Sequence, residues 1–234
     1  MSQIVNINNC QNAFSAKSIK SKYVLLYQGK PFVLAIEPSN KDVASGLFSY
    51  GLKPNYEYNK LTKTFTDKTT GEYTVPVCMA KDTLNKSIDE TKLEQVLGWM
   101  RHAIAEGIAA HEECMPCDIL VDSLVTKAKE EGKADVLNLK CKWVLPQGQR
   151  YVKGVQIKPE QKKFDTIFKY TEKGKRVVES DPTKLVDTPF TGIYFVEAGA
   201  ITASPTDGKY YMPLKLHTAV VAWKQAASYG NEYC

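Results

Sequence analysis

Aromatic, basic and apolar side chains alternate in the segment 209–217, which reads KYYMPLKLH. A period of two places successive residues of a strand on opposite faces. Tyr211 and Lys215 therefore share one face, while Leu214 and Leu216 share the other. Because rings stack on bases and cations neutralise phosphates, such a face suits single-stranded nucleic acid. Aromatic residues are interleaved with cations again over 140–176, so we expect one binding surface that uses both segments.

The residues expected to do this chemistry fall into two groups. The candidates for phosphate contacts are Lys140, Lys142, Arg150, Lys153, Lys163, Lys169, Lys209 and Lys215. The candidates for base stacking are Tyr151, Tyr194 and Tyr211. Trp143 and Tyr210 fall on the apolar parity of their strands, so we expect both of these rings in the core instead.

One cluster has the residue types of a metal site. His111, Cys114 and Cys117 are three residues apart, and His102 lies nine residues upstream. Zinc takes four nitrogen or sulfur ligands in a tetrahedron, so these four would suffice. However, the cluster holds a single C-x-x-C, and Pro116 lies inside it. We therefore predict no bound metal, with free thiols at a helix end.

Motifs of known enzymes are missing from the sequence. It has no G-x-x-x-x-G-K-[ST] phosphate loop, no G-x-G-x-x-G, no H-E-x-x-H and no G-x-S-x-G elbow. The acidic residues are dispersed among lysines rather than clustered as in two-metal nucleases. We expect a binding protein that needs no cofactor, and a metal-dependent nucleic-acid enzyme is the weaker possibility.

The elements that must position these residues are mostly strands. Apolar residues recur at helical spacing over 89–110, and Ser87 with Glu90 fits a capping box. A second helix is expected over 119–131. The remaining pattern predicts hairpins, and residues 46–60 are expected to be loop-like. The expected strands cover 23–36 (with a turn at 28–31), 62–66 with 73–79, 136–145, 164–170 with 175–179, and a long pair within 191–221. Two helices among strands predict an α+β fold.

Composition limits the possible classes of protein. The chain has 234 residues and a net charge of +5, and 43% of its residues are hydrophobic. This is typical of one globular domain with a mildly basic surface. No apolar run approaches the roughly 20 residues of a membrane span, and the N-terminus lacks the pattern of a signal peptide. We therefore expect an intracellular protein whose six cysteines are free thiols.

Several segments follow the order of strands in a known family. The quoted segments are KPFVL from Lys30, VLNLKCKWVL from Val136, FDTIFKYTEKGKRVV from Phe164, and GIYF followed by GKYYMPLKL near the end. In this order they resemble the single-stranded-DNA-binding proteins of nucleocytoplasmic large DNA viruses, which include those of African swine fever virus and algal viruses. The resemblance implies an OB-like β-barrel core with helical insertions. It covers one binding domain (20–222) with a helical insert near 87–132. Residues 1–19 are polar and rich in asparagine, so we expect a loose N-terminal arm there, and residues 223–234 are expected to form a short tail.

The expected function is sequence-independent binding of single-stranded DNA in viral replication, recombination or repair. The resemblance implies a host-cell location, in the cytoplasmic virus factory or the nucleus, with viral replication proteins as further partners. The segment after residue 223 carries one acid, Glu232, which argues against recruitment of those partners through an acidic tail. The alternative is a viral structural or protein-interaction module whose basic face is simply solvated. Oligomeric state and the preference for DNA over RNA stay open.

Overall fold

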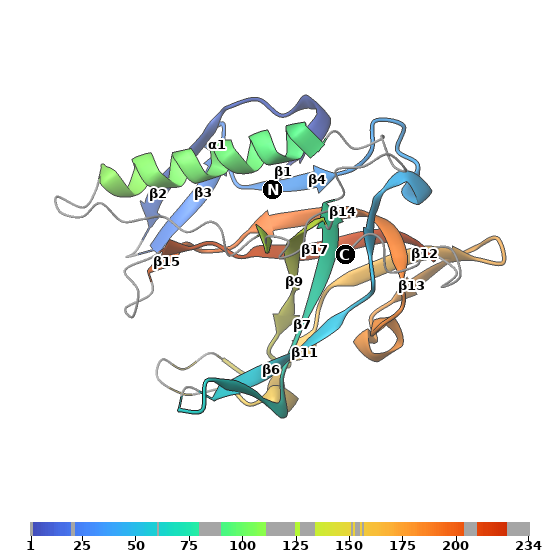
Figure 1. Cartoon of the computed structure of the whole chain (residues 1–234). Coiled ribbons are helices and arrows are strands. Elements are labelled where there is room, and N and C mark those ends of the chain that lie inside the picture. The colour runs from blue at the N-terminus through green and yellow to red at the C-terminus, as the bar shows by residue number, and fades with distance from the viewer. Residues whose placement is uncertain are drawn as a thin grey trace.

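The computed structural model describes residues 2–19, 22–59, 61–79, 90–110, 125–126, 134–150, 152, 155, 157–203 and 210–223 (Figure 1). Strands dominate this part of the chain, and it contains one α-helix, which confirms the α+β class. The elements are β1 (Gln3–Asn6), β2 (Phe14–Ile19), β3 (Lys22–Tyr27), β4 (Phe32–Ile36), β5 (Leu47–Ser49), β6 (Lys53–Asn59), β7 (Thr64–Met79), α1 (Glu90–Ala109), β8 (Val125–Thr126), β9 (Asp135–Cys141), β10 (Trp143–Val144), β11 (Lys163–Phe164), β12 (Ile167–Glu172), β13 (Lys175–Glu179), β14 (Phe190–Ala198), β15 (Thr202–Ala203), β16 (Tyr210–Tyr211) and β17 (Leu214–Trp223).

The strands β14, β5, β7, β9 and β17 form a circuit of hydrogen-bonded neighbours. β14 pairs antiparallel with both β5 and β17, and β7 pairs antiparallel with both β5 and β9. β9 joins β17 in parallel through Lys140 and Cys141. The pairing path therefore leaves β14 through β5 and returns to it through β17. The β5–β7 joint is the narrowest, with one register pair, Ser49 with Val77.

Two groups of strands extend this circuit. β4 pairs with β14, and β1 pairs with β4. On the other side, β12 pairs in parallel with β17 and forms a hairpin with β13, which confirms the predicted hairpin. The predicted pairing of the long strands within 191–221 is also confirmed, as the β14–β17 ladder. Apart from β13, these strands all contribute side chains to one hydrophobic core.

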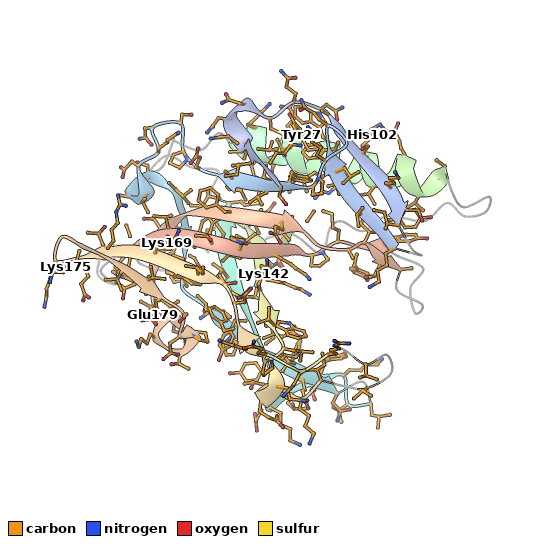
Figure 2. The ribbon with its side chains drawn as sticks, turned by 180° about the vertical axis from the view of Figure 1, so that it is seen from behind. Tyr27, His102, Lys142, Lys169, Lys175 and Glu179 are labelled. Carbon is orange, nitrogen blue, oxygen red and sulfur yellow. The ribbon has the colours of Figure 1, made fainter. Side chains whose placement is uncertain are left out.

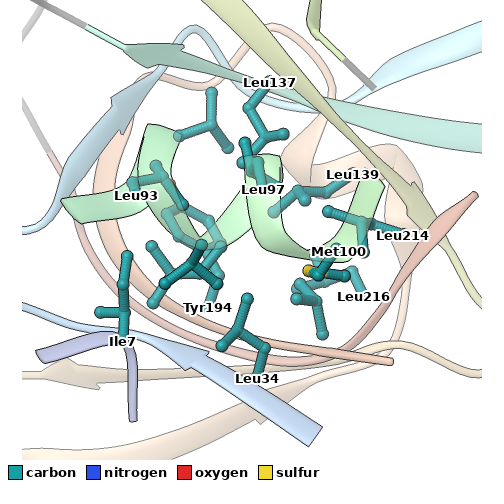
Figure 3. Packing of buried hydrophobic residues seen from close by; sticks show 14 of the residues in the cluster. Ile7, Leu34, Leu93, Leu97, Met100, Leu137, Leu139, Tyr194, Leu214 and Leu216 are labelled. Atoms are coloured by element: carbon teal, nitrogen blue, oxygen red, sulfur yellow. The ribbon is translucent and has the colours of Figure 1, made fainter. Parts of the chain in front are cut away.

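Helix α1 covers that core, as the apolar spacing over 89–110 predicts. Its buried face places Leu93, Leu97 and Met100 against inward side chains of the strands. Figure 3 shows this packing, in which the labelled residues are Ile7, Leu34, Leu93, Leu97, Met100, Leu137, Leu139, Tyr194, Leu214 and Leu216. In the part of the chain that is described, no helix is long and apolar enough to cross a membrane.

The expectation of a loose polar arm over 1–19 is wrong for the described residues 2–19. β1 pairs in parallel with β4, and β2 pairs antiparallel with β3. Val5, Ile7 and Cys10 are buried in the core. The asparagines that suggested a loose arm bond locally instead, since the Asn8 backbone N–H donates to Asn6 Oδ1 over 2.8 Å. Local polar bonds of this kind let a polar-looking segment bury its few apolar residues.

Other local predictions need correction. Val125 and Thr126, inside the expected second helix over 119–131, form strand β8 and pair with β9; the remainder of that range lies outside the described residues. Residues 46–60 are not mainly loop, because they contain β5 and β6. β7 is one continuous strand over 64–79 rather than two, and its hairpin partner is β6. The strands within 23–36 exist, but β3 pairs with β2 and β4 with β14.

The cysteines differ in state, so the prediction of six free thiols is wrong. Cys10 and Cys141 are free and buried, whereas Cys78 is disulfide-bonded. Burial raises the pKa of the Cys141 thiol to about 12, because a thiolate in the core would lack water around its charge.

Candidate nucleic-acid interface

The site begins with two lysines on neighbouring strands. Lys140 of β9 and Lys215 of β17 are register partners, and both are exposed. Leu214 and Leu216, which flank Lys215, are buried. This confirms the predicted parity of the β17 segment. Among the residues that are described, neither lysine has an ion-pair partner, so both charges are available to a phosphate.

A third lysine, Lys142, follows β9 directly, and a neighbouring carboxylate partly neutralises its charge. Lys142 Nζ lies 3.2 Å from Glu197 Oε2, and both side chains are partly buried. Glu197 is the register partner of Lys215 on β14. Among the described residues only Lys142 pairs with this carboxylate, so Lys140 and Lys215 leave a net positive charge on the outer face of these strands. A phosphate that approached would compete with Glu197 for Lys142.

A bulge in β17 extends this face toward β12. Phe195 pairs with Thr218 but Val196 pairs with Leu216, so His217 is the extra residue. Because of this extra residue, Lys215 and Val220 lie on the same face although they are five positions apart. Val220 is in turn the register partner of Lys169 in β12. At roughly 3.3 Å per residue, the step from Lys215 to Val220 is about 16 Å.

A groove continues the face beyond Lys169. It has a volume of about 860 Å³ and lies between the β12–β13 hairpin and the end of β17. Lys169 and Arg176 contribute charge, while Val178, Val220 and Trp223 contribute apolar surface. Val178 is 64% exposed. Within the described residues neither cation is ion-paired. Figure 2 shows Lys142 and Lys169 on the same side of the molecule. We call Lys140, Lys215, Lys169 and Arg176 the cationic face.

Sequence reasoning missed Arg176 as a site residue. It occurs in the GKR that follows the predicted turn, and Thr171 is its register partner on β12. Thr171 shares the parity of Lys169, so Arg176 faces the same way. The alternation within the hairpin could therefore have identified Arg176, once β12 and β13 were paired across the turn at 173–174.

The prediction of Tyr194 as a base-stacking residue is wrong. Its side chain is fully buried, and its hydroxyl donates to the Leu47 carbonyl oxygen over 2.9 Å. Burial also raises the pKa of this phenol. A ring enclosed in the core cannot contact a base. β14 carries apolar residues on both parities, from Phe190 to Val196, so alternation could not indicate which face was inside.

The other tyrosines of the C-terminal segment behave as their parity predicts. Tyr210 is buried, as expected, and Tyr211 is half-buried. They form the short strand β16, which pairs with β15 and ends before Met212. β16 and β17 are therefore separate strands rather than one, so the spacing between Tyr211 and Lys215 is not that of a single strand. Tyr211 stays a candidate for base contact.

Trp143 is not the core residue that its parity suggested. It is half-buried, and Lys162 Nζ lies 5.0 Å from the centre of its ring. It lines a pocket of about 620 Å³ together with Tyr58 and Glu72. The strand parity fails here because β9 ends at Cys141, and Trp143 belongs to β10, which pairs with β11.

The remaining predicted residues are scattered or lie outside the description. Arg150 and Lys163 are exposed, but neither belongs to the strands that carry the cationic face. Tyr151, Lys153 and Lys209 lie outside the described residues, as do His111, Cys114 and Cys117. His102 is exposed and pairs with Glu106, with His102 Nε2 lying 3.1 Å from Glu106 Oε1. In the described ranges, no group of three or more potential metal ligands occurs.

Comparisons with known proteins add no assignment to this geometry. No protein-family model matches the sequence, and no curated protein matches it. The resemblance to viral single-stranded-DNA-binding proteins therefore stays a prediction, and the cationic face is the feature of this molecule that indicates a function.

Proposed function

We propose that this protein binds single-stranded DNA without sequence preference, on an OB-like barrel. The observation that carries the proposal is the pair of exposed register partners Lys140 and Lys215, which have no ion-pair partner among the described residues and lie at the parallel joint of the strand circuit. An OB-fold is a five-stranded, partly open barrel whose strand faces bind oligonucleotides. The circuit of β14, β5, β7, β9 and β17, with its narrow β5–β7 joint, supports that architecture.

The arrangement of charge and apolar surface favours a single strand over a duplex. Cations release counterions from phosphates whichever form of DNA is bound. The apolar side chains of the groove, Val178 and Val220, gain only from contact with exposed base faces. A duplex hides those faces inside its stack. The groove therefore adds affinity only for unpaired bases, and base identity matters little because every base has such a face.

Binding of this kind would protect exposed strands during viral DNA replication, recombination or repair. The mechanism is passive, since it needs no cofactor and breaks no covalent bond. Cations hold the backbone while the groove shields the bases, so nucleases and complementary strands have less access.

Fluorescence anisotropy tests the proposal directly. We expect tighter binding of a labelled 20-nucleotide dT strand than of a duplex of matched length, with little difference among single-stranded sequences. An RNA strand of matched length is measured in parallel. Equal or tighter binding of duplex contradicts the proposal, and a clear preference for RNA contradicts the assignment to DNA.

The double variant Lys140→Ala/Lys215→Ala tests the cationic face itself. We expect weaker binding and a salt slope reduced by roughly 1.4, which corresponds to two phosphate contacts on a single strand at ~0.7 each. The matched control is Lys17→Ala/Lys30→Ala, which removes the same charge from exposed sites on and beside the β2–β3 sheet. Equal salt slopes for the two double variants would exclude this face as the interface.

A further inference from the structure

The hairpin of β6 and β7 carries exposed rings that the core does not explain. Tyr56, Tyr58 and Phe65 are 44%, 51% and 72% exposed, and Leu61 in the turn is 94% exposed. Side chains of this size are usually buried, so a group of them at one hairpin tip indicates an interaction site. The segment 46–60 was expected to be loop-like, but β6 lies beside β7 (Figure 1), and their register brings Tyr58 opposite Phe65.

Two of these rings form a platform. Tyr58 and Phe65 are register partners, and their ring centroids lie 5.2 Å apart at an interplanar angle of 63°. This edge-to-face contact holds both rings in place and leaves more than half of each side chain open to solvent. Neither ring belongs to the hydrophobic core cluster. The pair is therefore aromatic, in mutual ring contact and accessible, which suits base stacking.

Two lysines close to the platform can contact a polyanion. Lys63 lies in the hairpin turn and Lys68 lies on β7, and both are exposed. Neither has an ion-pair partner among the described residues. Asp67 lies between them in sequence, and Glu57, which precedes Tyr58 and lines the same pocket, carries a second carboxylate. An apolar protein surface would offer the two ammonium groups no counter-charge, whereas a nucleic-acid strand supplies phosphates for them and base faces for the rings.

β7 connects the platform to the cationic face. Phe65 lies near the start of this strand, and Thr74 is the register partner of Lys140. Nine residues at roughly 3.3 Å each separate Phe65 from Thr74, a span of about 30 Å along the strand. A short oligonucleotide cannot reach from one to the other, whereas a long one can.

We infer that the Tyr58–Phe65 platform is a second contact for the same DNA strand, where bases stack beyond the reach of the cationic face. This inference rests on the proposed function and adds to it a prediction about strand length. Strands of about five nucleotides occupy the cationic face alone. DNA strands of about 20 nucleotides reach both the cationic face and the platform, and stacking on the platform adds to their affinity. Stacking itself does not make binding more salt-dependent, so only Lys63 and Lys68 would add to the salt slope.

The test compares binding of 5- and 20-nucleotide dT strands to the intact chain. We expect Tyr58→Ala/Phe65→Ala to weaken binding of the long strand about tenfold or more and to leave binding of the short strand unchanged. The salt slope should hardly change, because rings release few counterions. Ile19→Ala is the matched control, since it removes an exposed apolar side chain from β2, outside this hairpin. Phe65→Tyr keeps the ring and should keep long-strand affinity.

Each outcome decides between the two claims. If the unaltered protein binds neither strand, the proposed function fails and the platform inference falls with it. If it binds both and the double variant binds the long strand equally well, the inference alone is overturned. Equal loss for both lengths, with an unchanged thermal melt, overturns the idea of a separate contact. A change of oligomeric state in sedimentation with unchanged DNA binding would instead assign the rings to contact between protein copies, and would also overturn it.

Discussion

The Tyr194 hydroxyl stabilises the junction of β14 with β5, because it donates to the Leu47 carbonyl oxygen within the core. Tyr194→Phe removes this bond and should lower the free energy of unfolding by about 1 kcal/mol, the usual net worth of a buried hydrogen bond. Chemical denaturation measures the change. Tyr58→Phe, which removes an exposed hydroxyl, should change stability by less than about 0.5 kcal/mol. Unchanged stability of Tyr194→Phe would show that this hydroxyl does not stabilise the junction.

Cys141 should make the free energy of unfolding depend on pH in the alkaline range. Its pKa is raised from 9.0 to about 12 by burial. The folded state therefore keeps the proton at pH values where the unfolded thiol loses it. The resulting stability is fully present below about pH 9 and is lost as pH rises from 9 to 12. Denaturation midpoints of the unaltered protein and of Cys141→Ala should therefore converge over this range. Parallel pH profiles for the two proteins would contradict the assignment.

Single residues also show what alternation can and cannot predict. The exposure of Lys215 was predicted correctly because Leu214 and Leu216 flank it, so only the leucine face of this strand could be buried. Tyr194 was misplaced because both parities of β14 are apolar. The step from Lys215 to Lys169 could not be predicted at all. It depends on the bulge at His217, and a bulge leaves no mark in the hydrophobic pattern.

At the scale of elements, the junction of β5 with β14 depends on close backbone contact at Gly46. A Cβ atom added at Gly46 would lie 2.1 Å from the Gly192 carbonyl oxygen. Gly46→Ala must therefore push β5 away from β14, and we expect a loss of about 1–3 kcal/mol, typical of forced extra atoms in a packed core. Thermal melts measure it.

Gly98→Ala is the control for this substitution. Gly98 lies within α1, and an added Cβ would meet no atom within 4 Å. Alanine there should stabilise the protein by about 0.5–1 kcal/mol, because it favours the helix. The two substitutions add the same methyl group and should act in opposite directions. Destabilisation of equal size by both would show that the Gly46 contact is not special.

Element types were easier to predict from sequence than element partners. Helix α1 was predicted because seven apolar residues repeat at its period over several turns. The hairpin of β12 and β13 was predicted because its turn is local. By contrast, β4 pairs with β14 and β5 pairs with both β14 and β7. Pairing between strands that are distant in sequence depends on how the whole core packs. The local hydrophobic pattern of one strand carries no information about that packing.

At the scale of the molecule, a net charge of +5 says little by itself. Several cations are already paired, as Lys53 with Asp187 and Lys162 with Glu72. What matters is that the four cations of the cationic face, which have no ion-pair partner in the described part of the chain, lie on adjacent strands of one sheet. The sequence pattern selected Lys140, Lys169 and Lys215 of the cationic face, but it could not indicate which lysines are neutralised, since ion pairing is set by residues far apart in the chain.

The position of β17 has a consequence for how this protein is made. β17 contacts β9, β12 and β14, and it occupies residues 214–223. On the ribosome, β5, β7 and β9 are therefore complete long before the strands that join their ends exist. Until β14 and β17 have been synthesised, the edges and apolar faces of β5, β7 and β9 stay exposed to solvent. We expect shortened chains that end before residue 214 to aggregate rather than fold, as exposed strand edges do during slow assembly of distant contacts.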